Sequence, residues 1–316
     1  MLGIDIGTAA IKLALMRRRR RAWCLQAYAV QPLQNAANDG GRLDGVDLRA
    51  SLKAALAQLP QPSTLWPLPK KARLAAMALD GTEAMTRVVR LDSGLTQQEI
   101  ENRVALEAEQ YLPFPLEQAC LDFCRLPQGN EAGQPVMLVA CRRERIVERM
   151  DLLMGLGIRP VTLDLDALAL CRAANLMALP APQILLDLGA EGFRLHAYDN
   201  GCLVYSRSHA STPVSVSEAD ASIGGDDLAA LAQEVRRAIQ LFLMSTACKG
   251  RAEITLVGGL AACPGLAQSI ASASGSPVSL SQPPSEVIAH ARIDPGQWRA
   301  VAPQLSLACA LAMRVA

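Results

Sequence analysis

The feature that most constrains this chain is a short pattern that occurs twice, about 180 residues apart. At residues 3–7 and again at residues 186–189, an apolar run leads into an Asp and then a Gly, in the forms GIDIG and LDLG. In both places two further strand-like segments follow the turn. The duplication predicts two similar β-sheet lobes, each offering an Asp–Gly loop to one cleft. A chain of 316 residues is long enough for two domains of roughly 150 residues each.

Composition and charge exclude several classes of protein. Apolar residues make up 51% of the chain and charged residues 19%, so we expect a folded protein rather than a disordered one. Because 31 basic residues balance 30 acidic ones, no overall charge indicates a nucleic-acid partner. The nine cysteines are irregularly spaced and lie mostly in apolar runs, which is typical of buried thiols in a reducing compartment. We expect no zinc site, because there is no CxxC pair and the histidines lack ligand spacing.

The amino-terminal segment does not read as a membrane or export signal. Its arginines, at residues 17–21, follow the apolar stretch, whereas a secretory signal carries its positive charge first. No clean run of 18 or more apolar residues occurs. We therefore expect a cytoplasmic protein, at most peripheral to a membrane. The arginine run itself is either a solvated hairpin tip or a contact to anionic lipid.

Periodicity and turn residues predict the order of elements along the chain. Predicted strands lie at residues 2–16 (with a Gly-Thr turn), 23–30, 74–79, 121–126, 136–141, 184–189, 194–198, 202–206 and 254–257. Predicted helices lie at residues 47–59, 144–156, 166–176, 228–245 and 305–313. A further helix begins at the capping box of Thr96 and Glu99 and ends before Pro113.

Three glycine turns have the chemistry of a nucleotide site. A Gly lets backbone amides approach an anion, and the amides that follow can cradle a phosphate. An Asp beside them can hold Mg²⁺ through water. A third turn, Gly258-Gly259, lies between a strand and a helix, where a flat base and ribose can approach. Each turn alone is a weak signal, and the ordered trio is a much stronger one.

Together these motifs resemble the actin, Hsp70 and sugar-kinase superfamily. The resemblance implies a phosphate-1 loop at Asp5, Gly7, Thr8, Ala9 and Lys12, a phosphate-2 loop at Asp187, Gly189 and Ala190, and an adenosine loop at Gly258, Gly259 and Leu260. It implies ATP as cofactor, with Mg²⁺ held through water by Asp5 and Asp187. Asp166 falls where such folds position the attacking water, and an N-cap or surface acid is the equally weighted alternative.

More narrowly, the chain resembles the PilM family of type IV pilus assembly proteins. The stretches that carry this resemblance are residues 3–12, GIDIGTAAIK, residues 106–116, LEAEQYLPFPL, and residues 256–266, LVGGLAACPGL. The middle stretch is the specific one, because a generic actin-fold ATPase does not carry it. The implied fold is α/β: an actin-like (ribonuclease H-like) two-lobe ATPase fold with an inserted 1C-type subdomain and a shortened second lobe. The expected boundaries are residues 1–80 and 144–180 for the first lobe, 81–143 for the 1C subdomain, 181–295 for the second lobe and 296–316 for a terminal helix returning to the first lobe.

The resemblance also implies a function. The family suggests a cytoplasmic adaptor at the inner-membrane face that binds the cytoplasmic tail of a PilN-like membrane protein and, through it, connects to the pilus motor ATPases. We expect the tail in a groove between the first lobe and subdomain 1C, with Tyr111, Leu112 and Phe114 as contact residues; a helix end with inward-packing aromatics is the alternative. ATP binding is expected to be weak, since Ala9 and Ala10 lack hydroxyls, Glu191 adds negative charge, and a family segment before the long helix is missing. The alternative function is a small-molecule kinase, for which Asp166 is the evident general-base candidate.

Overall fold

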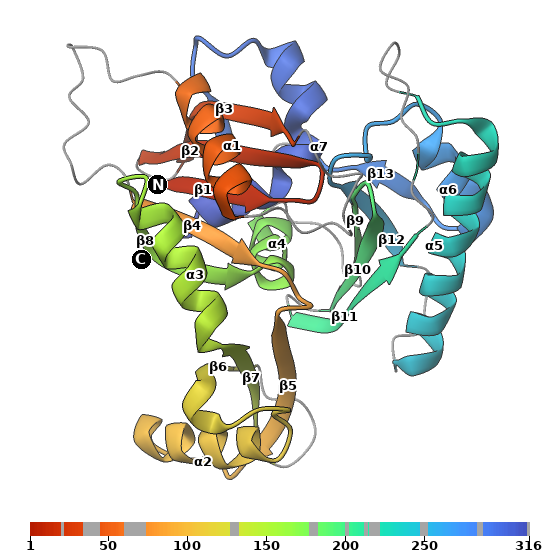
Figure 1. Ribbon diagram of the computed structural model, residues 1–316. Coiled ribbons are helices and arrows are strands. Elements are labelled where there is room, and N and C mark those ends of the chain that lie inside the picture. The colour runs from red at the N-terminus through yellow and green to blue at the C-terminus, as the bar shows by residue number, and fades with distance from the viewer. Residues whose placement is uncertain are drawn as a thin grey trace.

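The computed structural model contains two sheet-based lobes and a third, smaller sheet (Figure 1). It describes residues 1–19, 22–33, 45–59, 74–126, 133–176, 183–199, 202–211, 214, 222–246, 252–282 and 287–314. Residues 20 and 21 of the arginine run lie outside these ranges. The two expected lobes are confirmed.

The first lobe is a six-stranded sheet with helices on both faces. Its strand order is β14 (Val287–Ala289), β3 (Ala22–Pro32), β2 (Ala10–Arg19), β1 (Leu2–Ile6), β4 (Leu74–Leu79) and β8 (Arg159–Leu165). β1 lies inside the sheet, antiparallel to β2 and parallel to β4, which is why its residues are almost continuously buried. One face packs against α1 (Gly45–Gln58) and α3 (Arg143–Met154), through side chains such as Leu52 and Leu153.

The second lobe is a five-stranded sheet that repeats the opening of the first. Its order is β11 (Cys202–Ala210), β10 (Gly192–Asp199), β9 (Gln183–Leu188), β12 (Glu253–Val257) and β13 (Val278–Leu280). α5 (Gly225–Ser245) and α6 (Leu266–Ser274) cover one face, where Phe242 is fully buried. Leu185, Tyr198 and Val257 instead join a core with α4 (Asp166–Leu176) and α7 (Pro295–Ala312), so these two helices are packed between the lobes.

The inserted subdomain is a three-stranded sheet with one covering helix. β7 (Gln134–Arg142) lies between β5 (Ala84–Leu91) and β6 (Ala119–Arg125), and all pairings are antiparallel. α2 (Gln97–Glu109) starts at the predicted capping box and packs Ile100, Val104 and Ala108 onto one face of the sheet. A short turn of 3-10 helix, Leu116–Gln118, leads from its Pro-rich end into β6. On the opposite face, Val139 and Cys141 pack against Ile146 of α3 and Leu168 of α4.

The terminal helix begins ten residues before the expected start of residue 305, so that prediction of its start is wrong. The Asp294 side chain caps it by accepting a hydrogen bond from the Gln297 amide. Pro295 occupies the first helical position, where a backbone N–H would have no partner within the helix, so the missing N–H of proline costs nothing. Pro303 lies inside the helix, although proline usually ends one. Its carbonyl accepts a hydrogen bond from the Gly258 amide and so ties the helix to the second lobe.

Four of the described strands were not expected from the sequence: β5, β8, β13 and β14. The chain re-enters the first sheet at β14, ahead of the boundary expected at residue 295, because β14 pairs in parallel with β3. Among the helices in the described ranges, none is long and apolar enough to cross a membrane.

Candidate functional site

Each lobe opens with a β-hairpin that pairs an Asp with a cation across two strands. In the first lobe Asp5 of β1 lies opposite Lys12 of β2, and Lys12 Nζ is 3.0 Å from Asp5 Oδ2. In the second lobe Asp187 of β9 lies opposite Arg194 of β10. In both hairpins the cation comes seven residues after the Asp. The internal repeat therefore includes a charge pair as well as the Asp–Gly turn.

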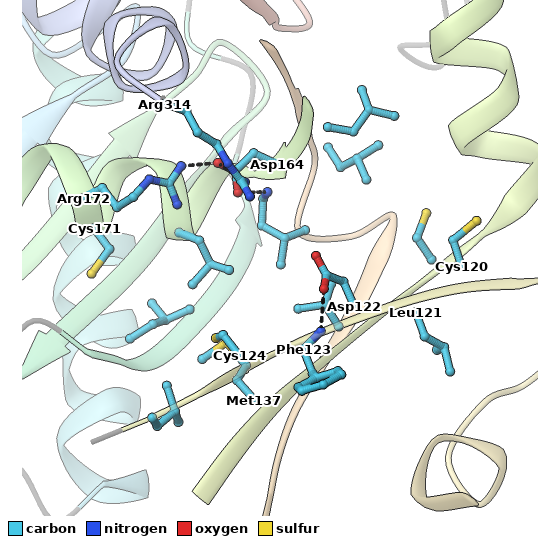
Figure 2. Close-up of a pocket in the computed structure, with 18 of the residues that line it drawn as sticks. Cys120, Leu121, Asp122, Phe123, Cys124, Met137, Asp164, Cys171, Arg172 and Arg314 are labelled. Atoms are coloured by element: carbon cyan, nitrogen blue, oxygen red, sulfur yellow. Dashed lines mark hydrogen bonds and ion pairs between the residues drawn. The ribbon is translucent and has the colours of Figure 1, made fainter. Parts of the chain in front are cut away.

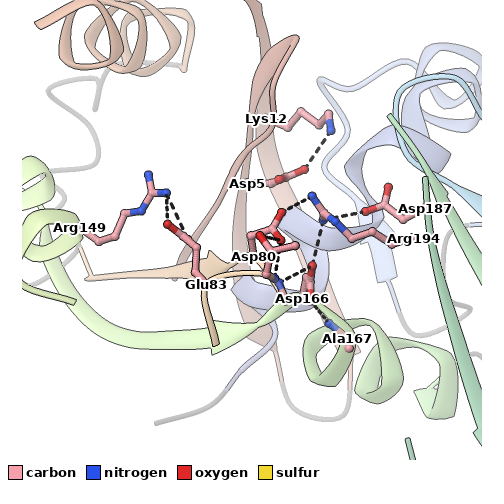
Figure 3. Close-up of polar contacts among 11 residues, drawn as sticks. Asp5, Lys12, Asp80, Glu83, Arg149, Asp166, Ala167, Asp187 and Arg194 are labelled. Carbon is pink, nitrogen blue, oxygen red and sulfur yellow. Dashed lines mark hydrogen bonds and ion pairs between the residues drawn. The ribbon is translucent and has the colours of Figure 1, made fainter. Parts of the chain in front are cut away.

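Arg194 reaches beyond its own hairpin into the first lobe (Figure 3). Its Nη2 is 2.6 Å from Asp80 Oδ2, and its Nη1 is 2.9 Å from Asp166 Oδ2 and 3.3 Å from Asp187 Oδ2. Asp80 follows β4 directly and Asp166 follows β8 directly. Because β4 and β8 are parallel neighbours, their carboxyl ends bring these two side chains to the same edge of the sheet.

The electrostatics of this cluster reflect its burial. Burial raises the pKa of Asp166 to about 6, against the opposing effect of Arg194, and only 1% of the Asp166 side chain is exposed. The pKa of Asp80 is lowered although burial acts to raise it, because Arg194 and hydrogen bonds from Thr82 stabilise the carboxylate. The four nearby carboxylates of Asp187, Asp166, Asp80 and Asp5 raise the pKa of Arg194 against the effect of burial. Arg194 is therefore a permanent cation.

The two expected phosphate loops are tight hairpin turns. The Gly7 amide donates to the Ala10 carbonyl at 3.0 Å, and the Gly189 amide donates to the Gly192 carbonyl at 2.9 Å. Both glycine amides are therefore used within their own turns. Thr8 and Ala9, at the tip of the first turn, are exposed, and Ala190 is half-buried in the second.

In the expected adenosine loop, close packing leaves no room for a side chain at Gly258. Its φ is +97°, and a Cβ there would lie 2.4 Å from Asp187 Oδ1 and 2.6 Å from the Leu188 carbonyl. The Leu260 amide donates to that same carbonyl at 3.1 Å. Gly259, by contrast, has nothing within 4 Å of an added Cβ. Gly258 therefore positions β12 against Asp187, and the open side of the turn is at Gly259.

The residues of the cleft do not fit a Mg²⁺–triphosphate in this arrangement. Of the two expected Mg²⁺ ligands, Asp5 is paired with Lys12 and Asp187 with Arg194. Lys12 and Arg194 are in turn committed to carboxylates rather than free for phosphate. Asp166, the catalytic candidate, accepts hydrogen bonds from the amides of Ala167 and Gly81 as well as from Arg194. Within the described ranges, no group of three His, Cys, Asp or Glu side chains is arranged to hold a metal ion. We derive no metal or nucleotide step for this chain.

A large cavity lies between the inserted subdomain and the first lobe (Figure 2). Its volume is about 740 Å³, which is in the range of ligand-binding pockets. One wall is the face of the three-stranded sheet opposite α2, including Asp122, Cys124, Met137 and Val139. The other wall is formed by residues of β8, α4 and β11, and the five cysteines in the lining are Cys120, Cys124, Cys141, Cys171 and Cys202.

One end of the cavity carries a pair of arginines. Arg172 of α4 and Arg314, just after α7, both contact the carboxylate of Asp164, which is 3% exposed; the Arg314 contact measures 2.9 Å. Both arginines line the cavity and are more than one-third exposed. Because one carboxylate faces two guanidinium groups, this end carries positive charge and spare hydrogen-bond donors.

The three residues expected to contact a partner lie outside this lining. The Arg87 guanidinium lies 3.7 Å from the centre of the Tyr111 ring, and that of Arg142 lies 4.1 Å from the centre of the Phe114 ring. Leu112 packs partly buried against the core under α2. The expected groove between the first lobe and the subdomain does contain a cavity, but its walls are other residues. Whether Tyr111, Leu112 and Phe114 contact a partner stays a prediction.

Sequence reasoning missed Arg194 and the residues that line the cavity. For Arg194 a signal existed, because aligning the two Asp–Gly repeats places it at the position of Lys12. The cavity residues offered no such signal, since they come from segments far apart in the chain and meet only through packing.

Two lobes with matching hairpins that face a common cleft define an actin-like ATPase fold, and solved structures agree. The ethanolamine utilization protein EutJ from Carboxydothermus hydrogenoformans superposes with a TM-score of 0.52 at 14% identity, covering 99% of this chain and 88% of that one. The cytoplasmic domain of EpsL, an inner-membrane component of the type II secretion system of Vibrio cholerae, gives 0.52 at 11% identity, covering 100% and 95%. The expected fold class is thereby confirmed.

The family is identified by two further matches. The family model described as type IV pilus assembly protein PilM matches residues 3–212 and 228–316, so this chain belongs to that family. A solved PilM–PilN type IV pilus biogenesis complex contains a chain that matches with a TM-score of 0.75 at 23% identity, covering 99% of this chain and 97% of that one. Between the two matched ranges, residues 213–227 are unmatched; they extend into the first turn of α5, next to the place where the sequence indicated a missing family segment.

Proposed function

We propose that this protein is a cytoplasmic adaptor of the type IV pilus inner-membrane complex that binds the tail of a PilN-like membrane protein in the cavity between β6–β7 and β8–α4. The observation that carries the proposal is the cavity itself, which is lined by the face of the three-stranded sheet opposite α2. The family membership and the solved PilM–PilN complex support the class of partner.

The cavity suits an extended apolar segment. Its walls include Leu79, Met137, Val139, Leu168 and Leu203, which offer apolar contact area for several side chains. β6 is an edge strand, paired with β7 on one side, so its other edge is available for main-chain hydrogen bonds from an added strand. A short tail that is disordered when free gains affinity in this way, by filling a preformed groove.

The arginine pair gives the tail a direction. Arg172 and Arg314 place donors at one end of an otherwise apolar cavity, with Asp164 holding both in position. We expect acceptor groups of the tail, either main-chain carbonyls or a side-chain amide or carboxylate, to lie at this end. Its apolar side chains then lie toward Met137 and Val139.

In this proposal the protein is held at the inner-membrane face by its partner, and its connection to the pilus motor ATPases is indirect. Nucleotide has no step in the proposal, because the cations of the cleft are committed to carboxylates. Weak ATP binding stays a prediction, and no observation in the described residues favours the alternative of a small-molecule kinase.

Titration calorimetry with the tail peptide tests the proposal. Cys124 is exposed on β6 and lines the cavity, so Cys124→Trp fills the cavity mouth with an indole ring. We expect it to weaken peptide binding at least tenfold. The matched control is Leu106→Trp on α2, a 58% exposed position on the helix that leads to Tyr111, outside the cavity lining; we expect it to leave affinity unchanged. If Leu106→Trp weakened peptide binding and Cys124→Trp did not, the partner site would lie at the end of α2 and not in the cavity.

A further inference from the structure

Arg194 breaks the symmetry between the two hairpins. Lys12 contacts the Asp of its own hairpin, whereas Arg194 also crosses the cleft to two carboxylates of the other lobe. These two, Asp80 and Asp166, leave adjacent parallel strands, so one guanidinium ties the edge of the first sheet to the second. The side chain of Arg194 is 27% exposed, which leaves it largely shielded from water.

A divalent cation at this place would need the same oxygens that Arg194 uses. Arg194 uses the Oδ2 atoms of Asp80, Asp166 and Asp187. Mg²⁺ binds carboxylate oxygens and water in a compact octahedron, so it needs those oxygens turned toward a single point. The planar guanidinium instead spreads its donors across them. While Arg194 is in place, the carboxylates are neutralised without a metal.

We propose that Arg194 is the resident cation of the interlobe cleft: it takes the place of a divalent metal and holds the two lobes together without metal or nucleotide. Its removal leaves three carboxylates facing one another, of which Asp166 is 1% exposed and cannot be hydrated in place. The two sheet edges then move apart around the shared core of α4 and α7, or a cation from solution takes the vacated position. This inference concerns the cleft alone and does not depend on where the partner tail binds.

The test compares wild type, Arg194→Gln and Arg207→Gln by thermal unfolding in EDTA and in MgCl₂, with NaCl added to keep the ionic strength constant. Arg207 is the matched control, because it is an exposed arginine on the neighbouring strand β11. We expect Arg194→Gln to lower the melting temperature by about 5 °C or more in EDTA. We expect MgCl₂ to recover part of that loss and to leave the wild type and the control unchanged. The proposal is overturned if Arg194→Gln has the same melting temperature as Arg207→Gln in EDTA, or if MgCl₂ stabilises the wild type as much as the variant.

Two further measurements keep the test valid if Arg194→Gln does not fold. Asp80→Ala removes the acceptor of the 2.6 Å contact across the cleft and leaves the buried Asp166 paired, so it is expected to fold. Small-angle X-ray scattering should show a larger radius of gyration for Asp80→Ala than for wild type. Paramagnetic resonance with Mn²⁺ should show no bound ion on the wild type at about 1 mM. An unchanged radius for Asp80→Ala, or a stoichiometric Mn²⁺ site on the wild type, would refute the resident-cation role.

Discussion

Replacing Gly3 by Ala would place a methyl group where the backbone of α7 already lies. A Cβ at Gly3 would be 1.8 Å from the Ala308 carbonyl oxygen and 2.8 Å from the Ala312 amide nitrogen. Ordinary contact requires about 3.5 Å, so α7 would have to move by more than about 1.5 Å. The atoms in the way belong to helix backbone, which cannot rotate aside as a side chain would. Since α7 packs on β1, β2 and β4, the shift would disturb the core of the first lobe.

We expect Gly3→Ala to lower the free energy of unfolding by about 3 kcal/mol, the upper part of the range for overpacked cores. For a chain of this length the melting temperature should fall by roughly 5 °C or more. The control is Gly225→Ala, at the start of α5, where nothing lies within 4 Å of the added methyl; we expect a change within about 0.5 kcal/mol. Urea unfolding followed by circular dichroism measures both. Equal stability of the two variants would refute the close packing of α7 on β1.

Three other predictions address pH, lipid and nucleotide. Because Asp166 releases its proton near pH 6 when folded and at its ordinary pKa of 3.8 when unfolded, the stability of wild type relative to Asp166→Asn should fall by about 3 kcal/mol as pH rises from about 4 to above 6. Burial lowers the pKa of His196 to about 4, so His196 changes the stability in the opposite direction, but its effect cancels in the comparison because both proteins carry it. Urea unfolding measures the difference in free energy of unfolding between the two proteins, and a difference that is flat or grows with pH would contradict the prediction. If the arginines at residues 17–21 touch lipid, replacing them by Ser should weaken the free energy of binding to anionic vesicles by about 1 kcal/mol per charge and so reduce co-sedimentation. Unchanged sedimentation would favour the solvated hairpin tip. Calorimetry with ATP and Mg²⁺ should show binding weaker than low micromolar, and turnover faster than roughly 1 s⁻¹ would refute the adaptor function.

Local pattern was enough to predict the parts of the fold that local chemistry determines. The Asp–Gly turns at Gly7 and Gly189 do join antiparallel strands, and the capping box at Thr96 does start α2. β5 and β8 were missed because their sequences, AMTRVVRL and RPVTLDL, lack the clean apolar alternation that marks a strand. The predicted start of α7 came too late because Pro303 lies inside the helix, and a proline usually ends one.

The functional sites depend on how distant segments pack, which explains why they were only partly predicted. Asp5 and Asp187 were expected as metal ligands, whereas in the structure each is paired with the cation across its own hairpin, Lys12 or Arg194. That Arg194 reaches Asp80, more than a hundred residues earlier, cannot be read from either segment alone. The same holds for the cavity, whose walls come from the inserted sheet and from both lobes.

The central claim, that the partner tail lies in the cavity, is tested most directly by thiol protection, which needs no mutation. Cys124, Cys120 and Cys202 line the cavity and are not fully buried, whereas the half-buried Cys263 lies in the second lobe outside the lining. Burial raises the pKa of both Cys124 and Cys263, so both are alkylated with N-ethylmaleimide at about pH 9 and followed by mass spectrometry. At a free tail-peptide concentration ten times its Kd, alkylation of Cys124 should slow by about tenfold while the rate at Cys263 stays the same. An unchanged rate at Cys124 under saturating peptide, or equal slowing at Cys263, would contradict the account.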